Sequence, residues 1–329
     1  MNRMTKNTSI IIGTCIITLL LAIIAIGLGS VPISVPDIFK TLFHQATMDK
    51  HETIIFDIRL PRVVLALVIG ANIAISGALL QAVMGNPLAD PGLTGVTSGA
   101  AAFVLLIMLA FPEYTQLIPI AAFVGGFIAA GIVYALAWKR NGISPITIIL
   151  SGVAVNALCG GAIGFLTIIY SDRLPSAVQW LNGSLAAKGA SALWMVLPYA
   201  IIGWVLSLFA IRKANMIRMG DQVATNLGEN VHRIRISLSI LAVFLAAISV
   251  AAIGMIGFVG LIVPHMARLI VGSNYKALLP MSMVLGALVL LVADTLGRTA
   301  FAPLDIPAGI FMALIGGPYF LYLMRKKAF

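Results

Sequence analysis

The chain has 329 residues, of which 60% are hydrophobic and only 10% are charged, and its mean hydropathy is +1.07. A water-soluble domain carries about 25% charged residues, so this composition excludes a soluble globular protein. On a soluble protein the net charge of +10 would suit nucleic acid. On a membrane protein, basic residues instead mark cytoplasmic loops, so we expect a lipid bilayer around the chain and no nucleic acid partner.

Apolar runs of about 20 residues recur along the whole sequence. Backbone polar groups must be paired in hydrocarbon, so only helices or closed barrels cross it, and these runs lack the alternation of barrel strands. We therefore predict an all-α polytopic membrane protein with about ten transmembrane helices in a single domain, 1–329. The apolar segments are 9–28, 63–84, 93–111, 117–138, 146–170, 190–211, 236–254, 256–271, 278–297 and 306–324.

Three of these segments need an interpretation beyond hydropathy. The first follows two basic residues like a signal peptide, but it is long and no small-residue cleavage site follows it, so we interpret it as a retained helix. The seventh and eighth are short and are interrupted by Gly254 and Gly257, so they form either a hairpin or one long broken helix. Pro264 and His265 are expected to end the eighth helix.

The distribution of basic residues sets the orientation. With the N-terminus inside and alternating crossings, 14 of the 21 Lys and Arg residues fall inside and 7 fall outside. Cytoplasmic loops carry an excess of Lys and Arg, so both termini are predicted to be cytoplasmic. Three loops exceed a simple turn: 30–61 and 171–189 outside, and 212–235 inside. A polar insertion as long as 212–235 in so hydrophobic a chain is expected to contact a partner.

The sequence lacks the chemistry of an enzyme or of an ion-coupled carrier. It has no Gly-x-x-x-x-Gly-Lys-Ser/Thr phosphate loop and its four histidines have no metal-ligand spacing, so we predict no catalytic residue, no metal site and no cofactor. Asp294 and Arg298, four residues apart, form either an ion pair at the membrane boundary or a transport site. The other charges fall at helix ends, so we expect transport energy to come from a partner.

Several motifs carry a resemblance to a known family. They are Ile58–Arg62 (IRLPR), Gly77–Gln81 (GALLQ), Asn86–Gly95 (NPLADPGLTG) and Gly257–His265 (GFVGLIVPH), followed by Arg268. The chain resembles the FecCD-like permeases of ATP-binding-cassette (ABC) importers for iron siderophores, haem and vitamin B12, from about residue 10 to the C-terminus. The resemblance implies a plasma-membrane permease subunit that imports an iron siderophore or a related metal chelate.

The resemblance also implies partners. Two permease subunits, identical or merely related, form a dimer, two ABC ATPase subunits bind on the cytoplasmic side, and an extracytoplasmic substrate-binding protein docks outside. In the family, arginines that match Arg59, Arg62 and Arg298 pair with acidic residues of the binding protein, because the fork of an arginine binds a carboxylate at two points. Anchoring of these arginines at lipid headgroups is the simpler alternative.

The inner loop contains a stretch that resembles the family's coupling helices, which insert into a cleft of the ATPase. After Gly220, Asp221 as N-cap and Gly228 as a stop signal predict a short helix. Ala224 and Leu227 belong to the same coupling segment. A solvated basic loop is the alternative.

Two further segments resemble the family's cytoplasmic gate. Asn86, Pro87 and Leu88 are predicted to end the second helix at the cytoplasmic face, beside the inner gate. Ser144 and Pro145 match the opposing part of the gate more loosely. Each segment is otherwise only a tight turn.

Two rival functions remain at this stage. An ion-coupled secondary transporter would need ion ligands near the centre of the bilayer. An intramembrane enzyme would need converging catalytic side chains. Copurification of an ATPase would favour the importer over both. The sequence specifies neither the chelate nor whether the permease dimer contains one kind of chain or two.

Overall fold

The computed structural model describes residues 3–29, 31–42, 52–139 and 142–325. Each of the predicted apolar segments holds a helix, so the prediction of an all-α polytopic membrane protein is confirmed. The corresponding helices are α1 (Arg3–Gly27), α4 (Leu60–Met84), α5 (Val96–Leu105), α6 (Ile118–Ala137), α7 (Pro145–Ile169), α9 (Ala190–Arg218), α11 (Val231–Ile253), α12 (Val259–Val271), α13 (Tyr275–Thr299) and α14 (Ala308–Arg325).

Seven of the described helices are long and apolar enough to cross a membrane. Three more, at 96–110, 259–271 and 308–322, are apolar but shorter. A full crossing takes about 20 residues, so the count of ten crossings stays a prediction. The remaining elements are α2 (Val35–Leu42), α8 (Leu174–Leu181), α10 (Asp221–Asn226), the π-helices η1 (Ile54–Arg59) and η3 (Leu106–Ala110), the 3₁₀ turns η2 (Pro91–Thr94), η4 (Pro112–Leu117) and η5 (Ser171–Arg173), and the paired strands β1 (Trp138–Lys139) and β2 (Gly142–Ile143).

Helix α4 is the most buried of the seven long helices and forms the centre of the bundle. It packs against α13, α11, α9 and α12. Gly77 of α4 lies so close to α12 that a Cβ atom there would sit 1.9 Å from the carbonyl oxygen of Gly260. Glycine at this crossing therefore lets two backbones touch, as small residues do between membrane helices.

The uncertain region between the seventh and eighth segments is a break between two separate helices. Helix α11 ends at Gly254, whose φ is +82°, and α12 begins after Phe258, whose φ is +69°. Both residues are in the left-handed half of conformational space, where a right-handed helix cannot continue.

Helix α12 contains a proline that does not end it. The expectation that Pro264 and His265 terminate this helix is wrong, because it continues to Val271. Pro264 has no N–H to donate, which frees a carbonyl one turn earlier. The side-chain amide of Gln81 lies within 3.5 Å of the carbonyl of Gly260 and compensates for the lost hydrogen bond.

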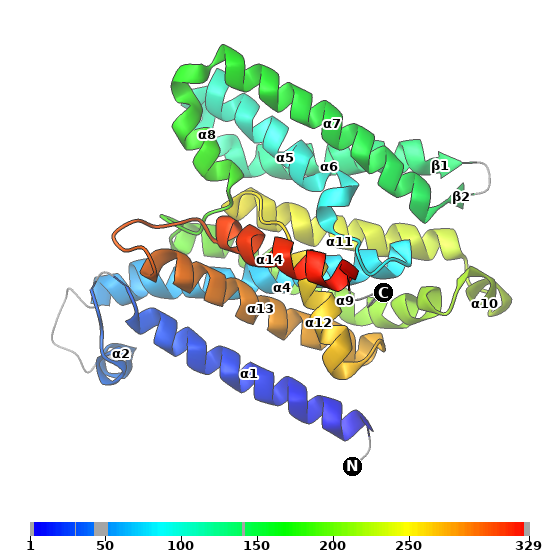
Figure 1. The fold of residues 1–329 in the computed structure, drawn as a ribbon, viewed down its shortest axis with the longest axis horizontal. Coiled ribbons are helices and arrows are strands. Elements are labelled where there is room, and N and C mark those ends of the chain that lie inside the picture. The colour runs from blue at the N-terminus through cyan, green and yellow to red at the C-terminus, as the bar shows by residue number, and fades with distance from the viewer. Residues whose placement is uncertain (1–2, 30, 43–51, 140–141, 326–329) are drawn as a thin grey trace.

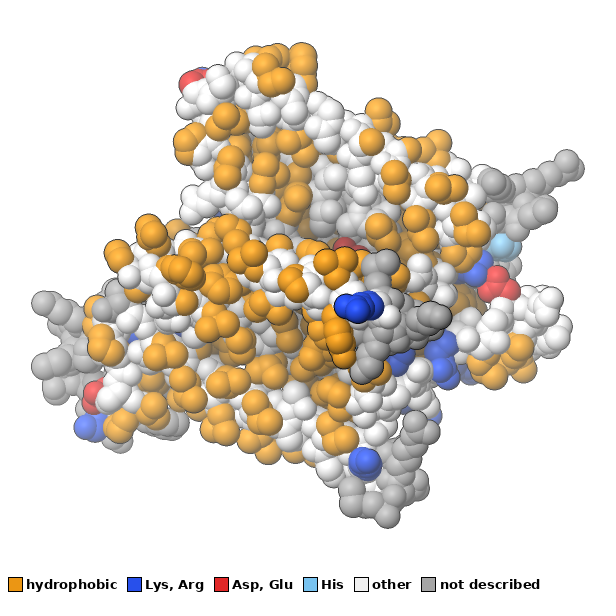
Figure 2. Space-filling view, viewed as in Figure 1, with side chains coloured by type: hydrophobic (Ala, Val, Ile, Leu, Met, Phe, Trp, Pro, Cys, Tyr) orange, Lys and Arg blue, Asp and Glu red, His pale blue; other side chains and the backbone are white. Residues whose placement is uncertain are grey.

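The elements separate into two ends of the bundle. Figure 1 shows α10, the β1–β2 hairpin, the start of α1 and the end of α14 at one end, which we call the inner end. Helices α2 and α8 and the loop between α13 and α14 lie at the opposite, outer end. The excess of basic residues assigns the inner end to the cytoplasm, an orientation that stays a prediction. Figure 2 shows apolar side chains over the middle of the bundle and several Lys and Arg side chains near its inner end.

Candidate functional site

Three arginines and two aspartates meet at the outer end. Arg59 and Arg62 lie where η1 passes into α4, Asp294 and Arg298 lie near the end of α13, and Asp305 lies in the loop before α14. We call these five residues the outer charge cluster. The contact between Arg62 and Asp294 joins positions 232 residues apart, so the tertiary fold builds the cluster.

Arg62 is held by two carboxylates at once. Its Nε and Nη2 atoms donate to Asp294 at 2.8–3.1 Å. Its Nη1 and Nη2 atoms donate to Asp305 at 2.7 and 3.0 Å. The side chain of Asp294 is 2% exposed, whereas that of Asp305 is 35% exposed. The planar fork of arginine suits such bidentate contacts, and here each of its two edges binds a different carboxylate.

The other two arginines bind the carbonyl groups at the end of α1. Arg59 donates hydrogen bonds of 2.6–3.2 Å to three carbonyls within 26–31. Arg298 donates to the carbonyls of Ala25 and Leu28. The last carbonyls of a helix have no partner within the helix, and their partial negative charge attracts cations. Two buried guanidinium groups therefore cap α1.

The sequence did not predict that these arginines would be buried and bonded within the chain. The pair of Asp294 and Arg298, foreseen from their spacing, is loose at 3.9 Å, because Asp294 binds Arg62 more closely. Asp305 was missed, since nothing local marks this acid in the loop as a partner of Arg62. The docking role of the three arginines stays a prediction.

The inner loop forms the predicted short helix α10, bounded by two glycines. Gly220 precedes it with φ +102° and Gly228 follows it with φ +81°. The prediction that Asp221 caps the helix is wrong, because Gly220 occupies the N-cap position. The carboxylate of Asp221 instead accepts two hydrogen bonds of 3.0 Å from Arg235 of α11.

Helix α10 has one buried and one exposed apolar side. Ala224 is fully buried against the bundle. Leu227 is 59% exposed, and Met219 and Val223 are also exposed. An apolar patch at the inner end, outside the seven long helices, is typical of a surface that a protein partner covers.

The two predicted gate segments are turns built by side-chain caps. The side-chain oxygen of Asn86 accepts a hydrogen bond of 2.8 Å from the N–H of Leu88, just after α4 ends. The hydroxyl of Ser144 accepts one of 3.3 Å from the N–H of Thr147, and Pro145 opens α7. These local contacts fit both the gate and the plain-turn interpretation.

Asp90, in the turn after α4, is a partly buried acid. Its carboxylate accepts a hydrogen bond of 2.8 Å from the N–H of Gly92 and caps η2. Protein atoms surround most of the carboxyl group, and this burial raises the pKa of Asp90 to about 6 against the opposing effect of the Gly92 hydrogen bond. Asn156 of α7 donates to the carbonyl of Gly92 at 3.0 Å, which ties this turn to α7.

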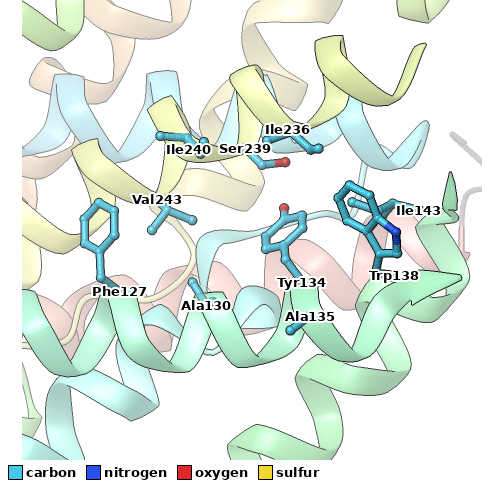
Figure 3. A pocket seen from close by; sticks show the side chains of 11 residues that line it. Phe127, Ala130, Tyr134, Ala135, Trp138, Ile143, Ile236, Ser239, Ile240 and Val243 are labelled. Carbon is cyan, nitrogen blue, oxygen red and sulfur yellow. The ribbon is translucent and has the colours of Figure 1, made fainter. Parts of the chain in front are cut away.

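Two cavities differ in polarity. One of about 540 Å³ lies near the outer end between α8, α9 and α11 and includes Lys188, whose pKa is lowered by burial. The other, of about 260 Å³, lies between α6 and α11, where Tyr134 and Ser239 face each other (Figure 3). Its walls are otherwise apolar, which suits a lipid chain better than a charged ligand. Among the described residues, no group of three or more His, Cys, Asp or Glu side chains could hold a metal ion.

The sequence matches the FecCD transport family over residues 17–326. The chain belongs to this family. Members are permease subunits of ABC importers and lie in the plasma membrane. The predicted membership in this family is therefore confirmed.

Curated relatives resemble this FecCD chain over nearly their full length. The Fe(3+)-citrate import system permease protein YfmE of Bacillus subtilis (strain 168) is 39% identical over 95% of this chain and 93% of its own length. The hemin transport system permease protein HmuU of Yersinia pestis is 39% identical over 94% of both chains.

A solved structure shares the fold of this FecCD chain. It is an ABC transporter assigned to the metal-chelate type and solved in an inward-facing conformation. The two chains are 31% identical and superpose with a TM-score of 0.87, over 97% of this chain and 99% of the other. The agreement therefore includes the short helices and loops as well as the long helices.

Proposed function

We propose that this chain is the permease subunit of an ABC importer that brings a ferric siderophore or a related metal chelate into the cell. The observation that carries the proposal is the agreement in sequence and fold with importer permeases along almost the whole chain. The relatives named for ferric citrate and hemin have in common a cargo in which an organic ligand holds iron. Iron bound in such a chelate is the proposed cargo.

The chain would work within a larger assembly. It would pair with a second permease subunit, identical or related, so that two chains enclose the pathway. Two ATPase subunits would bind at the inner end, at the α10 helices of the two permease subunits. The exposed apolar side of α10 with Leu227 supports this assignment. ATP binding and hydrolysis would then drive the change between outward-open and inward-open states.

The outer charge cluster is the proposed docking place of the substrate-binding protein. Arg59, Arg62 and Arg298 outnumber the two aspartates of the cluster, so one positive charge is in excess. Complementary charge steers association and fixes the orientation of a partner. An acidic surface on the binding protein would match this excess.

The inner gate is proposed to lie at the two capped turns. Asn86, Pro87 and Leu88 precede the η2 turn, which is tied to α7 through Asn156, and Ser144 and Pro145 begin α7. A movement of α7 would therefore be transmitted to the turn after α4.

Reconstitution tests the proposed function. The chain would be coexpressed with the ATPase and binding protein encoded beside it, purified, and placed in liposomes with ATP inside or outside. Uptake of radiolabelled ferric citrate or hemin that requires both ATP and the binding protein is the expected result. Uptake that needs neither, but collapses with an ion gradient, would instead identify an ion-coupled carrier.

A further inference from the structure

The members of the outer charge cluster differ in how firmly they are held. Arg59 and Arg298 bind five carbonyl oxygens at and just beyond the end of α1. Moving Arg59 would take a hydrogen bond from the buried carbonyl of Ile26, and moving Arg298 would take one from the partly buried carbonyl of Ala25, which is costly next to a membrane. These two arginines therefore act as a fixed frame.

Asp294 belongs to the same frame. Its carboxylate lies between Arg62 and Arg298 and is almost completely shielded from solvent. A buried carboxylate that bridges two arginines cannot leave without exposing uncompensated positive charge inside the protein. Only the contact between Arg62 and Asp305 remains as a movable part.

The contact between Arg62 and Asp305 lies on the exposed side of the cluster. Asp305 sits in a loop whose neighbours Phe301 and Leu304 are also well exposed. Ion pairs that reach solvent contribute little net stability, so a second carboxylate could replace Asp305 at low cost. The Nη1 and Nη2 atoms that bind Asp305 form the outward edge of the guanidinium fork.

We propose that Asp305 occupies, in the free permease, the place of a carboxylate from the substrate-binding protein. On docking, the partner's carboxylate would take over the outer edge of Arg62, and Asp305 would be released toward solvent. Arg59, Arg298 and Asp294 would stay in place and hold Arg62 in position. This inference rests on the proposed docking function and assigns the direct contact to Arg62 alone among the three arginines.

Two features of the surface agree with a protein partner at this place. The cluster has one positive charge in excess, which attracts an acidic partner, and the exchange of one carboxylate for another leaves that charge unchanged. Phe301 and Leu304 place exposed apolar area in the loop that carries Asp305. Exposed apolar side chains near charged groups are typical of a surface that a partner or a membrane covers.

Replacing Asp305 tests the exchange directly. The complete transporter would be purified in nanodiscs with its ATPase subunits, and the affinity of the purified binding protein would be measured by biolayer interferometry. Asp305→Asn removes the competing charge, so we expect roughly two- to fivefold tighter binding, the size expected for an exposed ion pair. Asp305→Ser should act in the same direction, which guards against a defect specific to one variant.

A matched control separates competition from general charge. Asp172→Asn also removes one exposed negative charge at the outer end, but Asp172 pairs with Arg173 and not with Arg62. We expect no comparable gain in affinity from this change. If Asp172→Asn and Asp305→Asn raised the affinity equally, long-range electrostatics would explain both gains. The proposal that a partner's carboxylate replaces Asp305 would then be wrong.

Arg62→Ala distinguishes failure of this inference from failure of the docking proposal. Docking through Arg62 predicts weaker binding by about tenfold or more, and no gain when Asp305→Asn is added to Arg62→Ala. Weaker binding by Arg62→Ala, but unchanged binding by both Asp305 variants, would refute the exchange and leave docking intact. Unchanged binding by Arg62→Ala in a correctly assembled transporter would refute both.

Discussion

The carboxylate of Asp221 accepts two hydrogen bonds of 3.0 Å from Nη2 of Arg235, and this pair ties α10 to α11. Arg235 is buried and also donates to the carbonyl of Ile143 in β2 at 3.1 Å. One guanidinium group thus links α10, α11 and the hairpin at the inner end. A pull on α10 would reach α11 and the start of α7 through this residue.

Loss of the Asp221 carboxylate should weaken this link without unfolding the chain. We expect Asp221→Asn to lower ATP-driven transport by about two- to fivefold, because the Asp221 carboxylate holds α10 in position against α11. The chain should stay folded, since an ion pair with an exposed member contributes little to stability. Transport and ATP hydrolysis by the reconstituted complex measure the effect. Glu229→Gln removes the same charge three residues after α10 and should have no such effect; a matching loss there would point to net charge alone.

Leu227 is expected to be an anchor for the ATPase. Leu227→Asp would place a charge in an apolar contact, so the ATPase should copurify at a level reduced by about tenfold. The permease itself should accumulate normally, since Leu227 is exposed in the free chain. Leu304→Asp makes the same change at the outer end and should leave ATPase binding untouched. Normal ATPase recovery with Leu227→Asp would remove α10 from the coupling interface.

Gly77 should tolerate no side chain at its crossing with α12. Gly77→Ala would bring a methyl group to 1.9 Å from the carbonyl oxygen of Gly260, so α4 and α12 must move apart. We expect a loss of roughly 1–3 kcal/mol in the free energy of unfolding, or failure to accumulate in the membrane. Thermal unfolding of the purified protein in detergent measures this loss of stability. Gly13→Ala in α1, where nothing lies within 4 Å, should be neutral or slightly stabilising.

Hydropathy and helix signals predicted most of the fold. Runs of apolar residues located the helices because lipid demands them at every crossing. The turn chemistry of Gly228 marked the end of α10 correctly, since a stop signal depends on near neighbours in the chain. Asp221 misled the same reasoning, because its distant partner Arg235 competes for the carboxylate.

The candidate docking site was only partly predictable. The family motif indicated Arg59, Arg62 and Arg298, but it carries no information on which carbonyls or carboxylates bind them. Asp305 meets Arg62 across 243 positions of sequence, and no local pattern encodes that contact. Pro264 shows the same limit in the core: α12 continues past this proline, and the side-chain amide of Gln81, from another helix, lies within 3.5 Å of the carbonyl of Gly260 that the proline leaves free.

Asp90 should make the stability of the protein depend on pH. Burial raises the pKa of Asp90 to about 6 from an ordinary value of 3.8, so the folded chain binds more protons than the unfolded chain between these values. Stability should therefore fall as the pH rises from 4 to 6 and stay reduced above that range. Asp90→Asn keeps an acceptor for Gly92 and carries no charge, so it should be more stable than the wild type at neutral pH by up to about 3 kcal/mol.

The comparison is made by thermal unfolding in detergent on either side of this range. The extra stability of Asp90→Asn over the wild type should be present near pH 7.5. It should disappear near pH 4, where the carboxyl group of Asp90 is largely protonated and, like the amide of Asn, carries no charge. Asp172→Asn changes the same charge on an exposed acid and should not reproduce the pattern. If Asp90→Asn were instead less stable at neutral pH, the ionised carboxylate would have a favourable partner in the turn after α4, and burial would not govern its titration.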